Sequence, residues 1–130
     1  MTTAYVDSSF FLGIAFDEAR GSHLRDVLAR YERLVSCDLL IAECLSAALR
    51  ESVDDDVILE ALRGIALVLP FRSLASEMRS TLEKGHLRGA DLWHLACALF
   101  VAEDETDRVA FLTRDVSQRR IARRLGFPTP

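Results

Sequence analysis

The stretch Ala4-Tyr5-Val6-Asp7-Ser8-Ser9 decides how the rest of the chain is interpreted. A short β-branched and aromatic run ends on a carboxylate, and an apolar run over residues 10–16 follows, which predicts a strand that passes directly into a helix. Asp7 is then at the carboxyl end of the strand, the edge where ligands bind in open α/β sheets. The alternative is that Asp7 only caps the helix, because its oxygens accept bonds from free N–H groups.

Length and composition predict a single cytoplasmic globular domain over residues 1–130, because half of the side chains are hydrophobic. No apolar run reaches the ~18 residues that a membrane span needs, and the first residues lack the basic region of a signal peptide. The cysteines Cys37, Cys44 and Cys97 lie in apolar surroundings and are expected to be reduced core thiols.

The net charge of −4 argues against a generally basic, nucleic-acid-binding coat, but the charge is unevenly distributed. Residues 108–130 contain six Arg and one Asp, whereas residues 1–107 contain 10 basic and 19 acidic residues. An acidic body with a basic C-terminal stretch can carry separate sites for cations and for phosphates.

The hydrophobic pattern predicts strands that alternate with helices. Beyond the first strand we expect strands over 34–37, 66–69 and 109–113, and helices over 8–16, 22–31, 38–51, 54–65, 73–84, 87–102 and 116–125, with a turn at 17–21 and a polar loop at 103–108. This alternation predicts an α/β fold with a central, mainly parallel sheet flanked by helices.

Three further carboxylates stand out. Glu43 lies in a helix that is apolar on almost every side, has no cation within one helical turn, and so needs a partner or a ligand unless it reaches the surface. Asp91 opens another apolar helix, whose dipole alone could explain it, and His94 one turn later is expected to be a core histidine rather than a metal ligand. Asp115 follows the last strand as Asp7 follows the first.

In a parallel sheet these acids converge on one edge, where their mutual repulsion calls for a positive group. Oxygen ligands favour a hard cation such as Mg²⁺ or Mn²⁺, which suits phosphate chemistry. The run of Asp54, Asp55 and Asp56 is instead expected to be a solvated helix start, because acids suit the positive end of the helix dipole.

The quoted residues resemble a known family. Tyr5-Val6-Asp7-Ser8-Ser9, Ile41-Ala42-Glu43, Gly89-Ala90-Asp91-Leu92-Trp93-His94-Leu95-Ala96 and Leu112-Thr113-Arg114-Asp115 resemble, in order, the four acidic motifs of PIN-domain ribonucleases, and the size and spacing are similar to those of the VapC toxins of type II toxin–antitoxin pairs. The resemblance implies a PIN fold, Mg²⁺- or Mn²⁺-dependent RNA cleavage, inhibition by a small cognate antitoxin and a homodimer.

The resemblance also assigns roles. It implies catalytic and metal-site roles for Asp7, Glu43, Asp91 and Asp115, with Thr113 as a neighbour of the site. The basic C-terminal stretch suggests RNA-phosphate contacts, unless its side chains are only a solvated helix face; these candidates are Arg114, Arg119, Arg120, Arg123 and Arg124.

Three alternatives to an endoribonuclease toxin remain open. One is a PIN-type RNA-processing nuclease that is not a toxin. Another is a phosphatase or phosphoacceptor domain with Asp7 as nucleophile, although Ser9 occupies the place where a second Asp would be expected. The third is a non-catalytic module whose acids receive a basic partner. Metal-dependent cleavage that is lost on Asp7→Asn would exclude the last.

Overall fold

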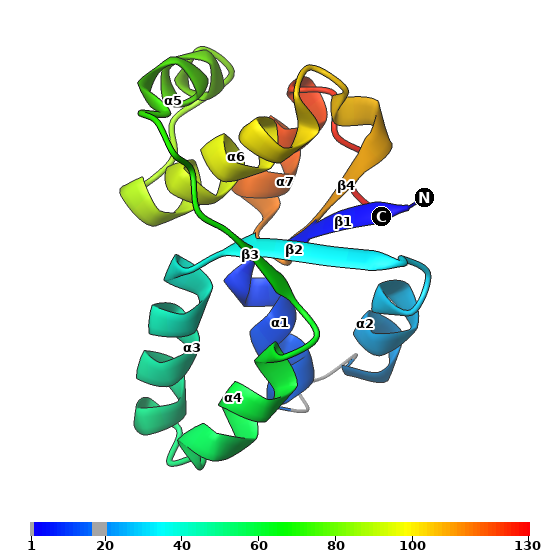
Figure 1. The fold of residues 1–130 in the computed structure, drawn as a ribbon, viewed down its shortest axis with the longest axis vertical. Coiled ribbons are helices and arrows are strands. Elements are labelled where there is room, and N and C mark those ends of the chain that lie inside the picture. Colours follow the sequence, from blue (N-terminus) through cyan, green and yellow to red (C-terminus); the bar gives the residue numbers. More distant parts are fainter. Residues whose placement is uncertain (1, 17–20) are drawn as a thin grey trace.

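The computed structural model describes residues 2–16 and 21–130, so residues 17–20 of the expected turn lie outside the described residues. Four parallel strands form one sheet in the order β3-β2-β1-β4 (Figure 1). The strands are β1 (Thr3–Val6), β2 (Arg33–Cys37), β3 (Ala66–Val68) and β4 (Val109–Leu112). The expected α/β architecture with a central parallel sheet is therefore confirmed.

Helices connect the strands near the expected places. They are α1 (Ser8–Ala15), α2 (Gly21–Leu28), α3 (Leu39–Arg50), α4 (Asp55–Leu62), α5 (Ala75–Leu82), α6 (Gly89–Ala102) and α7 (Val116–Arg124), with a 3-10 turn η1 (Thr106–Arg108) inside the expected polar loop. Helix α6 begins at Gly89 rather than at the expected Leu87, and α2 ends at Leu28, three residues before Tyr31. Apolar periodicity continues past both ends and so does not mark them.

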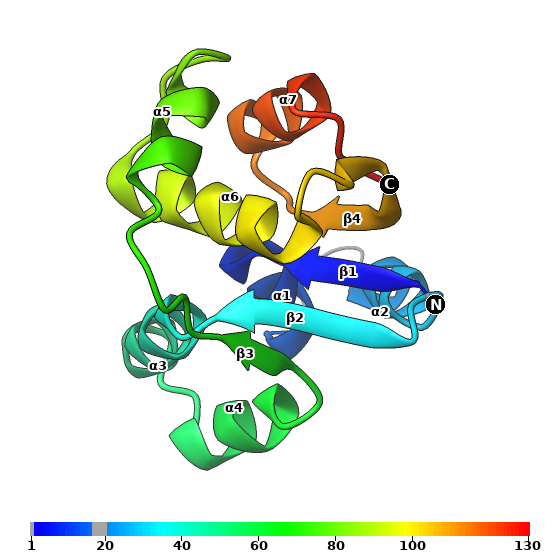
Figure 2. The same ribbon diagram turned by 45° about the horizontal axis from the view of Figure 1, so that its top comes forward.

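The two faces of the sheet carry separate cores because alternate strand residues point to opposite faces. Ala4 and Val6 pack with residues of α1 to α4 on one face. Helices α6 and α7 cover the other face (Figure 2), where their residues pack with Tyr5 and Phe111, whose ring centroids are 5.4 Å apart in a stacked arrangement. The three cysteines are buried and free, as expected.

Strand register brings the carboxyl ends of β1 and β4 level. Val6 pairs with Leu112, and the N–H of Asp7 donates to the carbonyl of Leu112 at 3.0 Å. Asp7 and Asp115 therefore follow neighbouring strands at the same edge of the sheet. No helix in the described part of the chain is long and apolar enough to cross a membrane.

Candidate metal site

Asp7 caps helix α1, but the cap occupies only one of its carboxylate oxygens. Its side chain is 1% exposed, and Oδ2 accepts from the backbone N–H of Ser9 at 3.2 Å and from Ser9 Oγ at 2.7 Å. Thr113 Oγ1, at the end of β4, lies 3.1 Å from the same oxygen. The N-cap interpretation of Asp7 is therefore confirmed, and the cap leaves its second oxygen, Oδ1, outside this set of contacts.

Oδ1 of Asp7 faces helices α6 and α7. Gln118 Nε2 donates to it over a long 3.4 Å and donates to the carbonyl of Asp91 at 3.3 Å. His94 Nε2 lies 3.7 Å from Oδ1. Neither contact is a short hydrogen bond, so this oxygen retains the capacity to bind a cation.

Thr113, the expected neighbour of the site, links Asp7 to α7. Its hydroxyl lies 2.7 Å from Gln118 Oε1 and accepts the backbone N–H of Asp115 at 3.0 Å. Because a hydroxyl has one proton, it donates either to Asp7 or to Gln118 at any moment. These contacts among Asp7, Thr113 and Gln118 hold the Asp7 carboxylate in place.

Glu43 finds its partner on another helix. Its Oε1 lies 2.7 Å from Nε2 of His94, which is completely buried on α6, while the Glu43 side chain is 27% exposed. The other ring nitrogen, Nδ1, lies 2.9 Å from the Tyr5 hydroxyl and 3.6 Å from Cys37 Sγ. His94 is thus a core histidine with both ring nitrogens in contact with polar partners, as expected. It is also the partner that the sequence predicts Glu43 to need.

The surroundings of His94 favour its charged form. Burial has the largest influence and lowers its pKa, but hydrogen bonds with Cys37 and Glu43 and the charge of Asp7 together raise the pKa to about 10. The imidazolium then donates Nε2–H to Glu43 and Nδ1–H toward Tyr5. His94 supplies part of the positive charge that the converging carboxylates require.

The other two acids complete the edge. Asp115 caps α7, and its Oδ1 accepts the backbone N–H of Gln118 at 2.7 Å. Asp91 is half-buried in the first turn of α6. Its pKa is raised first by burial and then by the charges of Asp7 and Asp115, with a smaller contribution from Glu43. Asp91 is therefore influenced by the charges of the other three predicted acids, although the four come from separate segments.

This donor set fits a divalent cation. Within the described residues no hydrogen bond reaches the carboxylate of Asp91, the second oxygen of Glu43 or the second oxygen of Asp115. Carboxylate oxygens are the ligands that Mg²⁺ and Mn²⁺ prefer. Of the described residues, only the exposed Asp54, Asp55 and Asp56 bring three such ligand atoms within 4.8 Å of one another, so the four carboxylates are spaced more widely than a closed three-ligand cluster.

The aspartate run behaves as a helix start. Asp54 caps α4 by accepting the N–H of Asp56 at 2.9 Å, and all three side chains are exposed. Exposed acids at a helix N-terminus are accounted for by the helix dipole.

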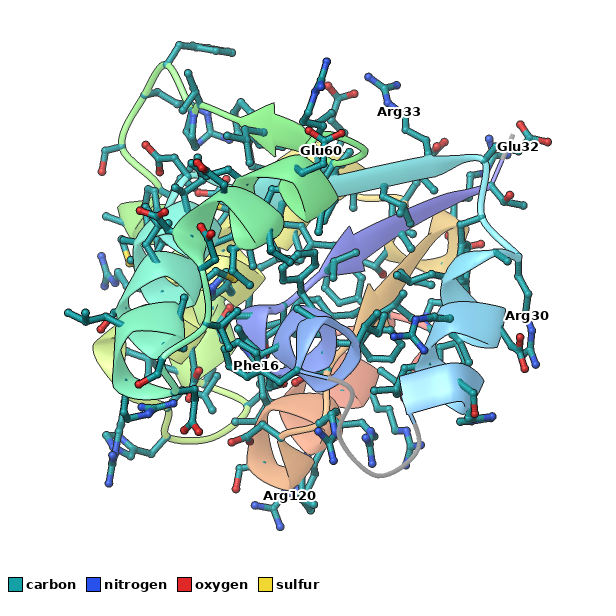
Figure 3. All side chains as sticks on the ribbon, turned by 90° about the horizontal axis from the view of Figure 1, so that it is seen from below. Phe16, Arg30, Glu32, Arg33, Glu60 and Arg120 are labelled. Carbon is teal, nitrogen blue, oxygen red and sulfur yellow. The ribbon has the colours of Figure 1, made fainter. Side chains whose placement is uncertain are left out.

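The five candidate arginines are not equivalent. Arg114, Arg119 and Arg123 line a hollow of about 400 Å³ that also contains Thr113 and the His23 ring. Arg119 additionally donates to the carbonyl of Thr113 at 2.8 Å, next to the Asp7 contact. The other two candidates lie elsewhere: Arg120 points outward from α7 (Figure 3), and Arg124 donates to the carbonyl of Lys84 at 2.7 Å.

Sequence reasoning missed three polar contributors to this edge. Gln118 donates to Asp7 although it lies 111 residues away in the sequence, His23 of α2 lines the hollow that contains Thr113, and Ser9 donates to Asp7 from two residues further on. An available signal was the Asp-x-Ser spacing, because a hydroxyl two residues after a capping Asp can reach its carboxylate.

A comparison with protein families matches residues 4–124 of this chain to the PIN domain. The match covers all four acidic segments and every strand residue of the sheet except Thr3. No curated protein matches the chain.

Proposed function

The chain belongs to the PIN domain family, and from this membership we propose that it is a divalent-metal-dependent endoribonuclease that acts as the toxin of a type II toxin–antitoxin pair. PIN domains are generally nucleases that act on RNA or DNA and usually use divalent metals. The choice of RNA and of a toxin role rests on the order and spacing of the four acidic motifs and on the size of the chain.

One observation supports this function above all others. Burial raises the pKa of Asp91, and the charges of Asp7, Asp115 and Glu43 raise it further. A fold gains nothing from gathering four acids at a half-buried edge, because like charges in low dielectric repel. A bound cation would offset this repulsion, so the arrangement is explained if the acids bind a cation during the reaction.

Asp7, Glu43, Asp91 and Asp115 would hold the ion. A bound divalent cation supplies a Lewis acid that activates water and neutralises charge on the phosphoryl oxygens. Ser9 and Thr113 hold Oδ2 of Asp7, which leaves Oδ1 directed toward α6 and α7.

Water attacks phosphorus in line and the bond to O3′ breaks, so the products carry a 5′-phosphate and a 3′-hydroxyl. His94 holds one oxygen of Glu43 at 2.7 Å and leaves the other oxygen for the reaction. The residues of the chain thus position the acids, and the hollow with Arg119 and Arg123 lies next to Thr113, where it can receive the phosphates of the bound strand.

The test uses purified protein and total RNA, with Mg²⁺, with Mn²⁺ or with a chelator. We expect cleavage only with metal, and loss of at least ~100-fold in rate on Asp7→Asn, because removal of one ligand charge weakens the ion and its water. Asp54→Asn is the matched control, since it makes the same change at another helix N-cap and should leave the rate unchanged. Cleavage that is indifferent to chelator, or that survives Asp7→Asn, would contradict the proposal.

The toxin role needs its own test. We propose that the chain forms a homodimer and binds a small cognate antitoxin, with apolar anchors and an Arg that meets the acidic edge. Co-expression with the small protein encoded next to it should give a tight complex with suppressed cleavage. If the two proteins are purified separately and mixing causes no inhibition, the chain is an RNA-processing nuclease rather than a toxin.

A further inference from the structure

A hollow of about 560 Å³ lies between the first turns of α3 and α6, beside the acidic edge. Its walls are Asp38, Leu39 and Ala42 from the start of α3, and Gly89, Ala90 and Trp93 from the start of α6. We call it the Trp93 pocket. None of these side chains belongs to the proposed metal site, and Trp93 is the single tryptophan of the chain.

Two residues that line the pocket directly precede acids of the acidic edge in the sequence. Ala42 immediately precedes Glu43, and Ala90 immediately precedes Asp91. Ala42 also lines the neighbouring hollow that contains Glu43. Glu43 and Asp91 each follow a lining residue by one position on the helix, so the pocket borders the two segments that carry these carboxylates.

Small residues keep the pocket open. A Cβ built on Gly89 would meet no atom within 4 Å, so Gly89 is not required by packing and the space in front of it is empty. Ala42 and Ala90 are equally short. Trp93 is half-buried and packs against the core on one side, which holds its ring as a fixed, flat wall.

The residues that line the Trp93 pocket favour a nucleobase over a phosphate as its occupant. Of the described residues, no Lys, Arg or His lines the pocket, and the exposed Asp38 would repel a phosphate. Asp38 occupies the cap position of α3 without making a side-chain cap bond, so its oxygens are free to accept N–H groups. A flat aromatic wall with a hydrogen-bond acceptor at its rim suits a nucleobase, which offers a π-face and edge N–H donors.

We propose that the Trp93 pocket holds an unpaired nucleobase of the substrate strand, next to the phosphate that is cut. The inference rests on the proposed nuclease function and adds a base-recognition site to it. Stacking on Trp93 supplies affinity, and Asp38 favours bases with an amino or imino N–H at the edge that reaches it. Bases that are paired in a duplex cannot enter, so the pocket makes the enzyme select single-stranded positions.

The binding test is done in chelator, so that nothing is cut. Because Trp93 is the only tryptophan, fluorescence excited at a wavelength that the two tyrosines do not absorb reports on this pocket alone. We expect a short single-stranded RNA to quench it, and inorganic polyphosphate and fully duplex RNA to leave it unchanged. Equal quenching by polyphosphate would overturn the inference, because polyphosphate has no base to stack.

Variants test the same point by RNA anisotropy. Gly89→Leu places a side chain in the pocket from a position whose Cβ has open space, and it should weaken RNA binding by about tenfold or more, the scale of one lost base stack. Gly64→Leu is the matched control, because Gly64 also has nothing within 4 Å of an added Cβ but lies far away between α4 and β3. Trp93→Ala should weaken binding similarly, and Trp93→Phe should restore most of it.

The results separate the two proposals. If wild type cuts RNA with Mg²⁺ but Gly89→Leu and Trp93→Ala bind as wild type does, the pocket inference alone is wrong. If RNA quenches Trp93 and Gly89→Leu abolishes the quenching, but no cleavage occurs, the pocket is supported and the nuclease proposal is wrong.

Discussion

At the scale of single residues, neighbouring side chains orient the carboxylates of the acidic edge through hydrogen bonds. Asp7 is held by Ser9 and Thr113, and Glu43 is held by His94. These partners bond to only one oxygen of each carboxylate. The carboxylate is therefore oriented while its second oxygen can still bind a cation. The imidazolium of His94 also lowers the cost of keeping four acids together when no cation is bound.

Glu43→Gln tests that pairing. We expect the metal-free variant to be less stable than wild type by about 1–3 kcal/mol, because a charge-assisted hydrogen bond to a buried cation becomes a neutral one. Urea unfolding in chelator at pH 7 measures it. Glu51→Gln, which removes only an exposed contact with Arg50, is the control and should change stability by less than ~1 kcal/mol. A variant that is more stable than wild type would show that repulsion among the acids outweighs the bond.

The raised pKa of His94 predicts a pH dependence. The folded state holds its proton up to about pH 10, whereas an unfolded histidine releases it near 6.5, so the stabilisation is complete below pH 6.5 and is lost as pH rises through 10. The unfolding free energy of metal-free wild type should therefore fall between pH 7 and 10.5, and His94→Gln should lose most of this fall. Equal slopes in both proteins would show that His94 is neutral in the fold.

At the scale of elements, α7 connects the metal site to the basic hollow. Its N-cap is Asp115, its first turn contributes Gln118, and the same helix carries Arg119 and Arg123 toward Thr113. Basic residues in the last turn also suit the helix dipole, so charge alone does not identify which arginines bind RNA. Position on the helix separates them.

Paired substitutions on α7 test this separation. We expect Arg119→Gln with Arg123→Gln to weaken RNA binding and to reduce the slope of log K against log salt by roughly two units, one for each lost phosphate contact. Arg120→Gln with Arg124→Gln removes the same charge from the other faces of the helix and should leave the slope nearly unchanged. Equal effects of the two pairs would mean that only net charge matters. Thermal melts establish that both pairs fold, since Arg119 also donates to the carbonyl of Thr113.

At the scale of the whole molecule, the parallel sheet gathers the site. Two cores on opposite faces fix the helices, and every strand ends at the same edge, so segments that are 36 to 108 residues distant from Asp7 contribute the other acids. The exposed run of Asp54, Asp55 and Asp56 on α4 is separate from that edge.

Metal-linked stability distinguishes the two acidic groups. At a free Mg²⁺ concentration ten times its dissociation constant, the folded protein should gain about 1.4 kcal/mol, seen as a rise of a few degrees in Tm. Asp7→Asn should remove most of the rise, and the triple change of Asp54, Asp55 and Asp56 to Asn should keep it. The opposite pattern would assign the metal to the start of α4.

Features that depend on local chemistry can be predicted from the sequence. Alternating apolar segments predict the α/β order, and carboxylates after the first and last strands predict the caps at Asp7 and Asp115, because these signals involve residues only a few positions apart. Burial of the cysteines and the solvated start of α4 follow in the same way. The four acids can likewise be identified from the sequence, since each interrupts or ends an apolar run.

Only the tertiary structure decided which side chains meet. Glu43 and His94 are 51 residues apart, and Gln118 and Asp7 are 111 apart, so their contacts depend on how α3, α6 and α7 pack on the sheet. Packing also divides the arginines between the basic hollow and the outer faces of α7, and it places Trp93 opposite Ala42. Helix periodicity gives the direction of a side chain relative to its own axis, whereas the rotation and distance between helices come from the complementary shapes of the core residues.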